Sequence, residues 1–423
     1  MLQVSFIRQN RDAVLERLAI KNFNQTGLVD ELVALDDERK KSQSDFDNAQ
    51  AKVNTASKDI GSLMRQGKKN ETELLKAEVA ALKTTIDSLK EKTAEIEKHL
   101  LEKLLLLPNL PHVDVPKGKT PEDNVVVREG GTKPALTDNA VPHWELAAKY
   151  KLIDFELGTK VTGSGFPFYI GKGAKLQRCL IQYFLDFNTA AGYLEYLPPF
   201  IVNEDSAYGT GQLPDKEGQM YHATADNFYL IPTAEVPVTN VYRDTILKED
   251  DFPIKMTAYS PCFRREAGSY GKDVRGLNRL HQFEKVEIIQ LVKPEKSYEA
   301  LDEMVAHVER LLQNLELPFR ILKLCGGDMG FASALTYDFE VYSAAQQRWL
   351  EVSSVSNFES FQTNRMKCRF KDATGKTQLA HSLNGSSLAL PRIVASLLEN
   401  NQAAEGIKLP EVLHGYFGAR IIS

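Results

Sequence analysis

The sequence has few cysteines and no excess of basic residues. Its 423 residues include only Cys179, Cys262, Cys325 and Cys368, none in a CxxC or CxxH spacing. This scatter excludes a zinc finger and a disulfide framework, so we expect free thiols in a reducing compartment. Lys and Arg number 52 against 57 Asp and Glu, a net charge of -5. That balance excludes a uniformly basic surface for nucleic acid but leaves room for a local basic patch.

Long apolar segments are also missing. The first residues include Arg8, Arg11, Asp12 and Glu16, so we expect no signal peptide. No uncharged apolar run approaches the length of a bilayer span, and we therefore expect a cytoplasmic protein without membrane contact. The chain is 43% hydrophobic and 26% charged, which is ordinary for a folded protein of about two or three domains.

The common nucleotide-loop and hydrolase motifs are absent. Glycine clusters at 163–165, 171–173 and 209–211 do not complete GxGxxG or GxxxxGK[ST], so they are interpreted as turns. No HExxH or GxSxG pattern occurs either. These absences exclude the Rossmann, P-loop, zincin and α/β-hydrolase assignments.

The first hundred residues carry two heptad series. The first occupies positions 28, 32, 35, 39, 42, 46, 49, 53, 56, 60 and 63, with a polar interruption at Arg39 and Ser42. The second holds Leu75, Val79, Leu82, Ile86, Leu89, Thr93, Ile96 and Leu100. A polar turn at 65–70 joins them, which predicts an antiparallel coiled-coil hairpin over about 28–106, about 50 Å long. A short amphipathic pattern within 1–25 would pack at its base, giving a domain at 1–107.

After this domain the pattern changes twice. Residues 108–142 contain six prolines and are interpreted as a linker. From residue 143 to 423, strand-like segments (254–263, 281–291, 349–355) interleave with helical ones (174–191, 296–314, 388–400). This predicts an α+β fold with a large antiparallel sheet flanked by helices.

Three segments carry residues suited to nucleotide chemistry. In the first, Arg264 and Glu266 precede a glycine-containing polar loop, and a strand follows whose alternation puts Phe283, Lys285 and Glu287 on one face. Guanidinium binds phosphate, an aromatic ring stacks on a base, and a carboxylate binds an ammonium group or a metal. The second segment, 349–354, is a strand whose carboxylate and hydroxyls could bind Mg²⁺. The third, 383–392, reads as strand, turn and helix, with Ser386 or Ser387 as the helix cap.

Together and in this order, these segments resemble the signature motifs of class II aminoacyl-tRNA synthetases. Residues 192–199 resemble motif 1, residues 263–287 motif 2, and residues 385–392 motif 3. Within that class, the stretches 209–214, 233–235, 275–283 and 351–354 resemble the seryl-tRNA synthetase family, whose characteristic arm is a helical hairpin. The resemblance extends over essentially the whole chain.

The resemblance implies a fold and a reaction. The expected sheet has six or seven antiparallel strands, in a homodimer with motif 1 at the subunit interface. The expected reaction makes seryl-adenylate from L-serine and ATP and then transfers the seryl group to the 3′ terminal ribose of tRNA(Ser). The selenocysteine tRNA is a further candidate substrate. Mg²⁺ is expected with ATP, and zinc is not.

The resemblance also implies site residues. Serine would be held by Thr233, Ala234, Glu235, Glu287 and Ser386. ATP would be bound by Arg264, Arg265, Glu266, Arg279, Phe283, Glu351, Val352, Ser353, Ser354 and Arg392. Among these, Arg264, Arg392 and Glu351 would be catalytic, with Arg264 on the α-phosphate, Arg392 on the γ-phosphate and Phe283 on adenine. Arg265 is expected to point away from ATP.

Two assignments depend on further reasoning. Glu351 and Ser354 would bind Mg²⁺, but strict strand alternation pairs Glu351 with Ser353, so either the strand breaks there or the ligand is Ser353. For tRNA binding we expect basic residues at the arm tip and along one stripe of the second helix, namely Arg65, Lys68, Lys69, Lys76, Lys83 and Lys90.

Other functions remain as alternatives. A related enzyme that activates a small amino acid for a carrier protein would be expected to lack the long arm, which is intact here. A non-catalytic, synthetase-like regulator would be expected to lose motif residues, yet Arg264, Glu266, Glu351 and Arg392 are present. Relatives specific for threonine or proline are disfavoured by the coiled-coil arm, and the threonine enzyme also by the missing zinc-ligand pattern.

Overall fold

The computed structural model describes residues 1–136, 140–215, 217–266 and 275–423. It divides into two compact units. The N-terminal unit comprises residues 1–19 and 23–108, and the C-terminal unit comprises residues 20–22 and 109–423. Part of the polar loop predicted after Glu266, including Gly268 and Gly271, lies outside the described residues.

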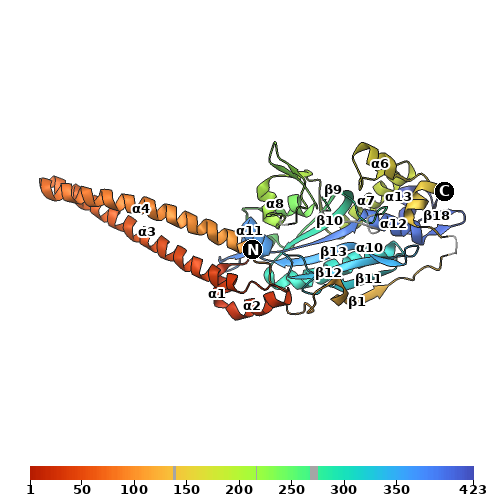
Figure 1. Ribbon diagram of the computed structural model, residues 1–423, viewed down its shortest axis with the longest axis horizontal. Coiled ribbons are helices and arrows are strands. Elements are labelled where there is room, and N and C mark those ends of the chain that lie inside the picture. Colours follow the sequence, from red (N-terminus) through yellow and green to blue (C-terminus); the bar gives the residue numbers. More distant parts are fainter. Residues whose placement is uncertain (137–139, 216, 267–274) are drawn as a thin grey trace. The chain divides into compact units, whose positions relative to one another are not determined.

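The N-terminal unit contains a long antiparallel helical pair. Helices α3 (Gly27–Arg65) and α4 (Lys69–Leu104) run side by side in Figure 1 and are joined through Gly67, whose φ of 73° suits glycine. Every position of both predicted heptad series is buried or half-buried. The predicted coiled-coil hairpin is therefore confirmed. Two short helices precede it, α1 (Val4–Gln9) and α2 (Arg11–Ile20).

The polar interruption in the first heptad series has partners. The Ser42 and Thr93 hydroxyl oxygens lie 2.8 Å apart between the two helices. One turn earlier, Arg39 donates to the buried Asp36 carboxylate at 2.9 Å, as does Arg8 of α1. Burial favours the neutral acid, but hydrogen bonds from surrounding basic side chains outweigh it and lower the pKa of Asp36 to about 2. The interruption is a satisfied polar layer that also docks α1.

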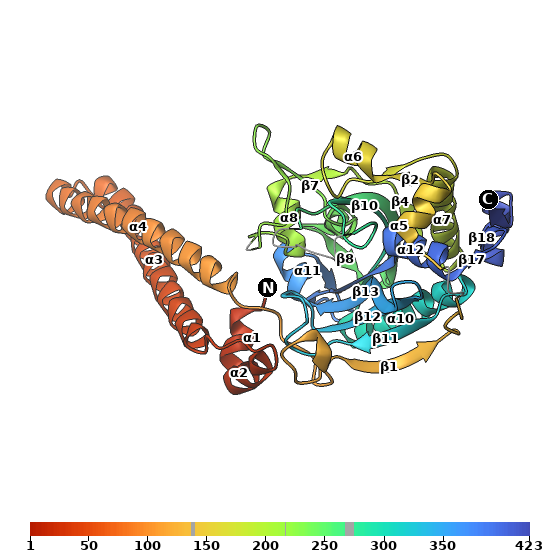
Figure 2. The ribbon, with the colours of Figure 1, turned by 45° about the vertical axis from the view of Figure 1, so that its right-hand side comes forward.

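The C-terminal unit is built on one large sheet. Its strand order is β1-β11-β12-β13-β16-β10-β9-β4. In that order the strands span Val125–Gly130, Phe319–Lys323, Leu335–Ser343, Arg348–Glu359, His381–Ala389, Gln282–Val292, Ile254–Phe263 and Leu194–Tyr196. Neighbours pair antiparallel except β4 with β9, and β1, β11, β12 and β13 lie side by side in Figure 2. The α+β architecture with a mainly antiparallel sheet is confirmed, with eight strands among the described residues instead of six or seven.

Helices cover both faces of this sheet. On one face, α7 (Lys172–Ala190), α10 (Ser297–Asn314) and α12 (Leu390–Asn400) pack in the main core with Val286 and Ile288 of β10. On the other, α9 (Glu235–Thr239) and α11 (Phe361–Met366) pack with Ile289 and Leu291. Because the side chains of β10 alternate between two cores, apolar residues occupy both faces of its second half, with Gln290 as the exception.

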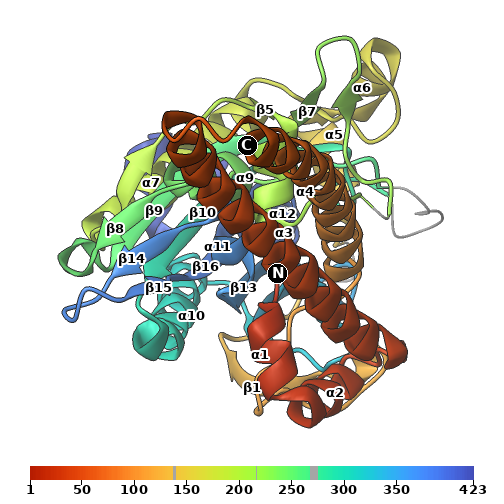
Figure 3. The same ribbon diagram turned by 90° about the vertical axis from the view of Figure 1, so that its left-hand side faces the viewer.

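Shorter elements complete the unit. The remaining helices are α5 (His143–Lys149), α6 (Phe155–Val161), α8 (Glu204–Thr210) and α13 (His414–Phe417). The remaining strands are β2 (Ile153–Asp154), β3 (Phe168–Tyr169), β5 (Ile201–Val202), β6 (His222–Ala223), β7 (Phe228–Leu230), β8 (Ile246–Lys248), β14 (Arg369–Lys371), β15 (Thr377–Leu379), β17 (Gln402–Ala403), β18 (Gly406–Lys408) and β19 (Ile421–Ile422). Figure 3 shows β14 and β15 beside β8, although more than 100 residues separate β8 from them in sequence.

Two sequence-based expectations differ from the structure. The linker prediction is incomplete, because residues 125–130 form the edge strand β1 of the main sheet. The predicted turn and serine cap in motif 3 are wrong, because β16 continues through Ser386 and Ser387, and the cap of α12 is Ala389. Ser386 is held in the sheet by pairing with Glu287, and the Ser387 hydroxyl donates to Asn188 at 2.8 Å.

All four cysteines are buried and free. Within the described part of the chain, no helix is both long enough and apolar enough to cross a membrane.

Candidate active site

Four consecutive strands carry the main predicted site residues. Glu351 lies on β13, Ser386 on β16 and Glu287 on β10, and Arg264 follows the last residue of β9. Because neighbouring strands lie about 4.8 Å apart, the sheet gathers residues that are up to 122 positions apart in sequence. The segment 233–235 at the start of α9 covers the same region of β10, since α9 packs against that strand.

Thr233 and Glu287 belong to a buried polar cluster. The Thr233 hydroxyl donates to Glu287 Oε2 at 3.0 Å, and Lys285 Nζ donates to Thr233 Oγ1 at 2.8 Å. Lys285 also forms an ion pair with Glu287. Both charged side chains are nearly inaccessible, and burying charge in this way is tolerable only when the charges are paired and hydrogen-bonded. The sequence interpretation placed Lys285 on the face of Glu287 by strand alternation but assigned it no role.

Glu235 is the second carboxylate of this region. It is buried, and Gln362 of α11 donates to its Oε1 at 2.5 Å. Gln362 is fixed in turn by donating to the Thr210 carbonyl at 3.1 Å and accepting from Ser382 at 2.7 Å. Burial, and then the nearby Glu287 charge, raise the pKa of Glu235 to about 7. This carboxylate would therefore be stabilised by any cation that enters the site.

Arg264 and Phe283 form a guanidinium–aromatic pair. The Arg264 guanidinium lies over the Phe283 ring, 5.2 Å from its centroid, and its Nε donates to the Pro232 carbonyl at 3.4 Å. The backbone N–H of Arg264 also donates to the His281 carbonyl at 2.9 Å, which fixes the end of the hairpin. The neighbouring Arg265 is exposed while Arg264 is half-buried. The two arginines therefore face different surroundings.

Glu266 and Arg279 meet across the base of the motif 2 loop. Arg279 Nη1 donates to Glu266 Oε2 at 2.9 Å, although 12 residues separate them. Glu266 adopts a φ of 50°, which turns the chain at this point. The ion pair brings together the two ends of a loop whose residues 267–274 are not described.

Arg392 is held by two backbone carbonyls. Its Nε donates to the Asn278 carbonyl at 3.0 Å, and its Nη1 donates to the Glu351 carbonyl at 2.7 Å. The Glu351 carboxylate lies 3.8 Å from the same Nη1. The Arg392 guanidinium therefore joins motif 3 to two other segments. These are Glu351 on β13 and Asn278, which lies in residues 275–281, the part of motif 2 that leads back into β10.

A bulge interrupts β13 between Glu351 and the two serines that follow it. In the pairing of β12 with β13, Phe339 faces Ser353 but Glu340 faces Glu351, so β13 carries one extra residue at Val352. Such a bulge interrupts strict alternation along the strand. Val352 packs in the main core, and the Ser353 hydroxyl donates to the Ser386 carbonyl at 2.6 Å. The alternative that made Ser353 the companion of Glu351 rested on unbroken alternation, which the structure does not have.

Ser354 instead lies beside the Asp338 carboxylate. It pairs with Asp338 in the ladder and hydrogen-bonds the Asp338 side chain. Burial, and then the nearby Glu351 charge, raise the pKa of Asp338 well above its usual range. Among the described residues, Asp338 Oδ1 is buried without a hydrogen-bond partner. The sequence interpretation missed Asp338, because no local pattern marks a residue on β12 as a neighbour of β13.

The predicted tRNA-binding residues all lie on the N-terminal unit. Lys68 pairs with Glu71 at 3.3 Å and Lys76 with Glu73 at 2.7 Å near the arm tip. The positions predicted to share a stripe are exposed along α4 at intervals of seven residues, and they are Lys76, Lys83 and Lys90. Seven residues are about two helical turns, so these ammonium groups lie on one side of α4.

Closely grouped metal ligands of the usual kind are not found in the described ranges. There, no three His, Cys, Asp or Glu side chains gather as a metal site. The donor set at β12 and β13 instead combines the Glu351 and Asp338 carboxylates with the Ser354 hydroxyl, and oxygen donors of this kind suit a hard cation.

Comparison with known proteins identifies both units. Residues 1–111 match the model of the seryl-tRNA synthetase N-terminal domain, and residues 220–401 match that of the tRNA synthetase class II core domain (G, H, P, S and T). The serine–tRNA ligase of Salinibacter ruber is 51% identical over 424 residues, covering 100% of this chain and 99% of the relative. That of Delftia acidovorans is 46% identical over 436 residues, covering 100% and 99%.

The structural comparison agrees. The crystal structure of seryl-tRNA synthetase from Pyrococcus horikoshii complexed with ATP matches with a TM-score of 0.93 and 31% identity, covering 100% of this chain and 99% of that one. Both the helical arm and the sheet that carries the candidate site are thus shared over their full length. This chain belongs to the seryl-tRNA synthetase family.

Proposed function

We propose that this chain is a serine–tRNA ligase that makes seryl-adenylate from L-serine and ATP and transfers the seryl group to tRNA(Ser). The observation that carries the proposal is that a buried carboxylate cluster and an arginine–aromatic pair lie on adjacent strands of the sheet, with a second arginine reaching from α12 to the returning part of motif 2. These groups supply a site for a small ammonium-bearing substrate beside a site for a nucleoside triphosphate.

Serine would be held by the cluster around Glu287. Thr233 hydrogen-bonds Glu287, Ser386 pairs with it in the sheet, and Glu235 lies close enough for its charge to be felt. Ala234 would be their small neighbour at the start of α9. The Glu235 carboxylate would bind the serine ammonium group, since burial and Glu287 already raise its pKa and favour a cationic partner. Alanine would leave a buried hydrogen-bonding group unpaired and be rejected strongly, whereas threonine must be excluded by the size of the pocket.

The nucleotide would lie across Arg264, Phe283 and Arg392. Arg264 would stabilise charge on the α-phosphate, Arg392 would bind the γ-phosphate, and the Phe283 ring would stack on adenine. The serine carboxylate is already a nucleophile, so its in-line attack on the α-phosphorus needs no general base. Catalysis therefore depends on positioning and on cations that stabilise the phosphate charge as pyrophosphate leaves.

Glu351 and Ser354 would hold Mg²⁺ with the phosphates. The unpartnered Oδ1 of Asp338 beside Ser354 fits such a cation site. The ion would supply positive charge that neutralises the phosphate oxygens. The other residues predicted to bind ATP would act less directly. Glu266 and Arg279 would hold the two ends of the motif 2 loop together, and Val352 and Ser353 would fix the strand that carries Glu351. The exposed Arg265 would point away from ATP.

The N-terminal arm would bind the tRNA. The net charge of the chain is negative, so phosphate contacts must come from a local basic surface, and the α4 stripe provides one. The role also predicts a cytoplasmic location. A homodimer is part of the proposal, because β4 is an edge strand of the sheet. Leu194 within β4 and Leu197 just after it are exposed apolar side chains, and covering such an edge is a common reason for twofold assembly.

Serine-dependent ATP–pyrophosphate exchange tests the site. Arg264→Ala and Arg392→Ala should each reduce the exchange rate at least about a hundredfold, the scale seen when one preorganised donor is removed. Arg420→Ala, which changes an exposed arginine near the C-terminus, is the matched control and should exchange at the wild-type rate. Normal exchange in both site variants would refute the site assignment.

The arm needs a separate experiment. Reversing Lys76, Lys83 and Lys90 to Glu should weaken tRNA charging and flatten its salt dependence, because fewer counterions are released on binding. Replacing residues 31–103 with a short linker should have a larger effect. In both variants, serine-dependent pyrophosphate exchange is the internal control and should stay largely intact. Normal tRNA KM in the arm-deleted enzyme would exclude the arm from tRNA binding.

A further inference from the structure

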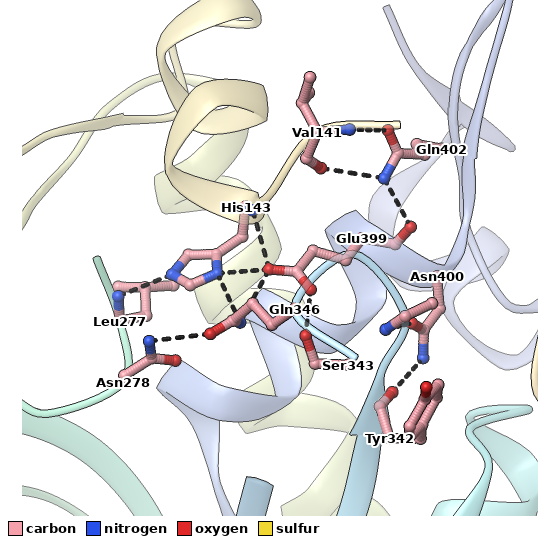
Figure 4. A network of polar contacts seen from close by, with 11 residues as sticks. Val141, His143, Leu277, Asn278, Tyr342, Ser343, Gln346, Glu399, Asn400 and Gln402 are labelled. Carbon is pink, nitrogen blue, oxygen red and sulfur yellow. Dashed lines mark hydrogen bonds and ion pairs between the residues drawn. The ribbon is translucent and has the colours of Figure 1, made fainter. Parts of the chain in front are cut away.

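A buried histidine–carboxylate pair lies beside residues 275–278, the limb of motif 2 that returns toward β10 (Figure 4). His143 is the first residue of α5, and Glu399 is near the end of α12; both are 0% exposed. His143 Nδ1 lies 2.7 Å from Glu399 Oε1, which also accepts from the His143 backbone N–H at 2.9 Å. Burial would raise the pKa of Glu399, but hydrogen bonds from His143 and Ser343 outweigh it and lower the pKa. The carboxylate is therefore a stable acceptor that orients the ring.

The other ring nitrogen of His143 accepts a hydrogen bond from the loop. The buried backbone N–H of Leu277 donates to Nε2 at 2.8 Å, so Nε2 must be unprotonated and Nδ1 must carry the proton. The chain approaches the ring closely: Gly276 has a φ of 65°, and a Cβ added there would lie 2.3 Å from Nε2. One residue earlier, the Arg275 guanidinium lies over the Trp144 ring, 4.7 Å from its centroid. The start of α5 thus anchors the limb 275–277 at successive points.

The same limb holds Arg392. Asn278 Nδ2 donates to Gln346 Oε1 at 3.0 Å, and Gln346 Nε2 donates to Glu399 Oε1 at 2.9 Å. The Asn278 carbonyl then accepts from Arg392 Nε at 3.0 Å. Arg392 and Glu399 are seven residues apart on α12, hence on one side of the helix and about 10 Å apart along it. Helix α12 therefore contacts this limb in two ways. Arg392 hydrogen-bonds Asn278 directly, and Glu399 is linked to it through Gln346.

We propose that His143, oriented by Glu399, is a positioning residue for ATP, which fixes Leu277 and Asn278 so that the Asn278 carbonyl holds the Arg392 guanidinium in its phosphate-binding orientation. This inference rests on the proposed function, in which Arg392 binds the γ-phosphate. A long arginine side chain samples many rotamers when unrestrained, and fixing it before ATP arrives lowers the cost of binding and of charge stabilisation. An apolar residue at 143 would fill the space but leave the Leu277 N–H buried and unpaired, which favours displacement of the limb.

Two isosteric substitutions separate the two hydrogen bonds of the ring. His143→Asn places an amide nitrogen near Nδ1 and keeps the bond to Glu399, but it cannot reach Leu277. His143→Gln places a carbonyl oxygen near Nε2 and keeps the bond from Leu277. We expect the Asn variant to raise the KM for ATP about tenfold, the effect of leaving one buried N–H unpaired, with the KM for serine changed less than about twofold. The Gln variant should keep the KM for ATP within about threefold of wild type.

Controls distinguish this effect from general destabilisation. Melting temperatures of both His143 variants should fall by similar amounts, because each loses one buried hydrogen bond. His414→Asn removes a histidine whose Nε2 lies 2.8 Å from the Leu409 carbonyl near the C-terminus, and it should lower stability without changing the KM for ATP. If either His143 variant does not fold, Gln346→Met cuts the half-buried link to Asn278 and should raise the KM for ATP about threefold.

The outcomes separate this inference from the proposed function. Arg392→Ala, measured in parallel, should raise the KM for ATP more than any of these variants. If it does so while the His143→Asn and Gln346→Met variants bind ATP normally, the positioning role is wrong and the proposed function stands. Equal increases in the KM for ATP and for serine in the His143→Asn variant would also overturn it, because they indicate a general structural role. A normal KM for ATP in the Arg392→Ala variant would instead contradict the proposed function.

Discussion

The pKa of Glu235 makes serine binding depend on pH. Burial and the Glu287 charge raise this pKa to about 7, and a serine ammonium group bound to the carboxylate requires its ionised form. The ionised fraction is roughly three quarters at pH 7.5 and roughly one tenth at pH 6.0 for such a pKa. We therefore expect the KM for serine to be about eightfold higher at pH 6.0 than at pH 7.5, with maximal exchange rate less affected.

The ionisation of Glu235 should also affect protein stability, but in the opposite direction: a rise in pH that improves serine binding should lower the unfolding free energy. An ordinary glutamate in the unfolded chain ionises near pH 4.5, so between that pH and about 7 the folded protein binds more protons than the unfolded one. The unfolding free energy of the serine-free protein should therefore fall by up to about 3 kcal/mol as pH rises through this window. Glu235→Gln removes the titrating group and should flatten this slope.

The assay is pyrophosphate exchange at a series of serine concentrations and pH values, with the KM for ATP as internal reference. Glu235→Gln is the matched control: it should bind serine weakly at every pH, with a KM that is nearly constant between pH 6.0 and 7.5. Calorimetry in buffers of different ionisation enthalpy should also detect proton release when serine binds the wild type at pH 6.0. A wild-type KM for serine that does not change over this range would refute the assignment of Glu235 as the ammonium ligand.

Three further expectations follow from the described contacts. Lys285→Met leaves the Glu287 carboxylate buried without its cation and should lower the unfolding free energy, measured with urea, by about 3–5 kcal/mol; adding Glu287→Gln should restore part of the loss, and no restoration would contradict a charged pair. Thr93→Val should destabilise the protein by about 1–2 kcal/mol by leaving Ser42 unpaired, whereas the double variant with Ser42→Val should be close to wild type in the same measurement. Glu351→Gln should raise the Mg²⁺ concentration required for half-maximal pyrophosphate exchange, and an unchanged Mg²⁺ dependence would remove Glu351 from the metal site.

Periodicity in the sequence predicted the helical arm and the main strands because both patterns are local. Heptad spacing fixes which side of α3 faces α4, and even Thr93, a polar residue, occupies its predicted seam position. Alternation likewise placed Lys285 and Glu287 on one face of β10. Recognition of motifs 2 and 3 added candidate residues, because each of these motifs keeps its functional residues within one continuous stretch, 263–287 and 385–392.

The sequence did not show which side chains from different strands contact each other. Local pattern favoured a turn and a serine cap in motif 3, but Ser386 remains in the sheet because its backbone pairs with Glu287 on another strand. Strict alternation favoured Ser353 beside Glu351, but the register with β12 inserts a bulge at Val352. Cross-strand register and bulges are set by the pairing partner, which a pattern within one strand does not report.

Contacts between residues far apart in the sequence were determined by tertiary structure alone. Glu399 lies 256 residues from His143, and Asn278 lies 114 residues before Arg392, yet both pairs are in direct hydrogen-bond contact. Such networks form because buried polar groups must find partners wherever the packed elements bring them. The sequence by itself determined the arm, the sheet and the identity of the motif residues; only the packing of α5 and α12 decided how Arg392 is held.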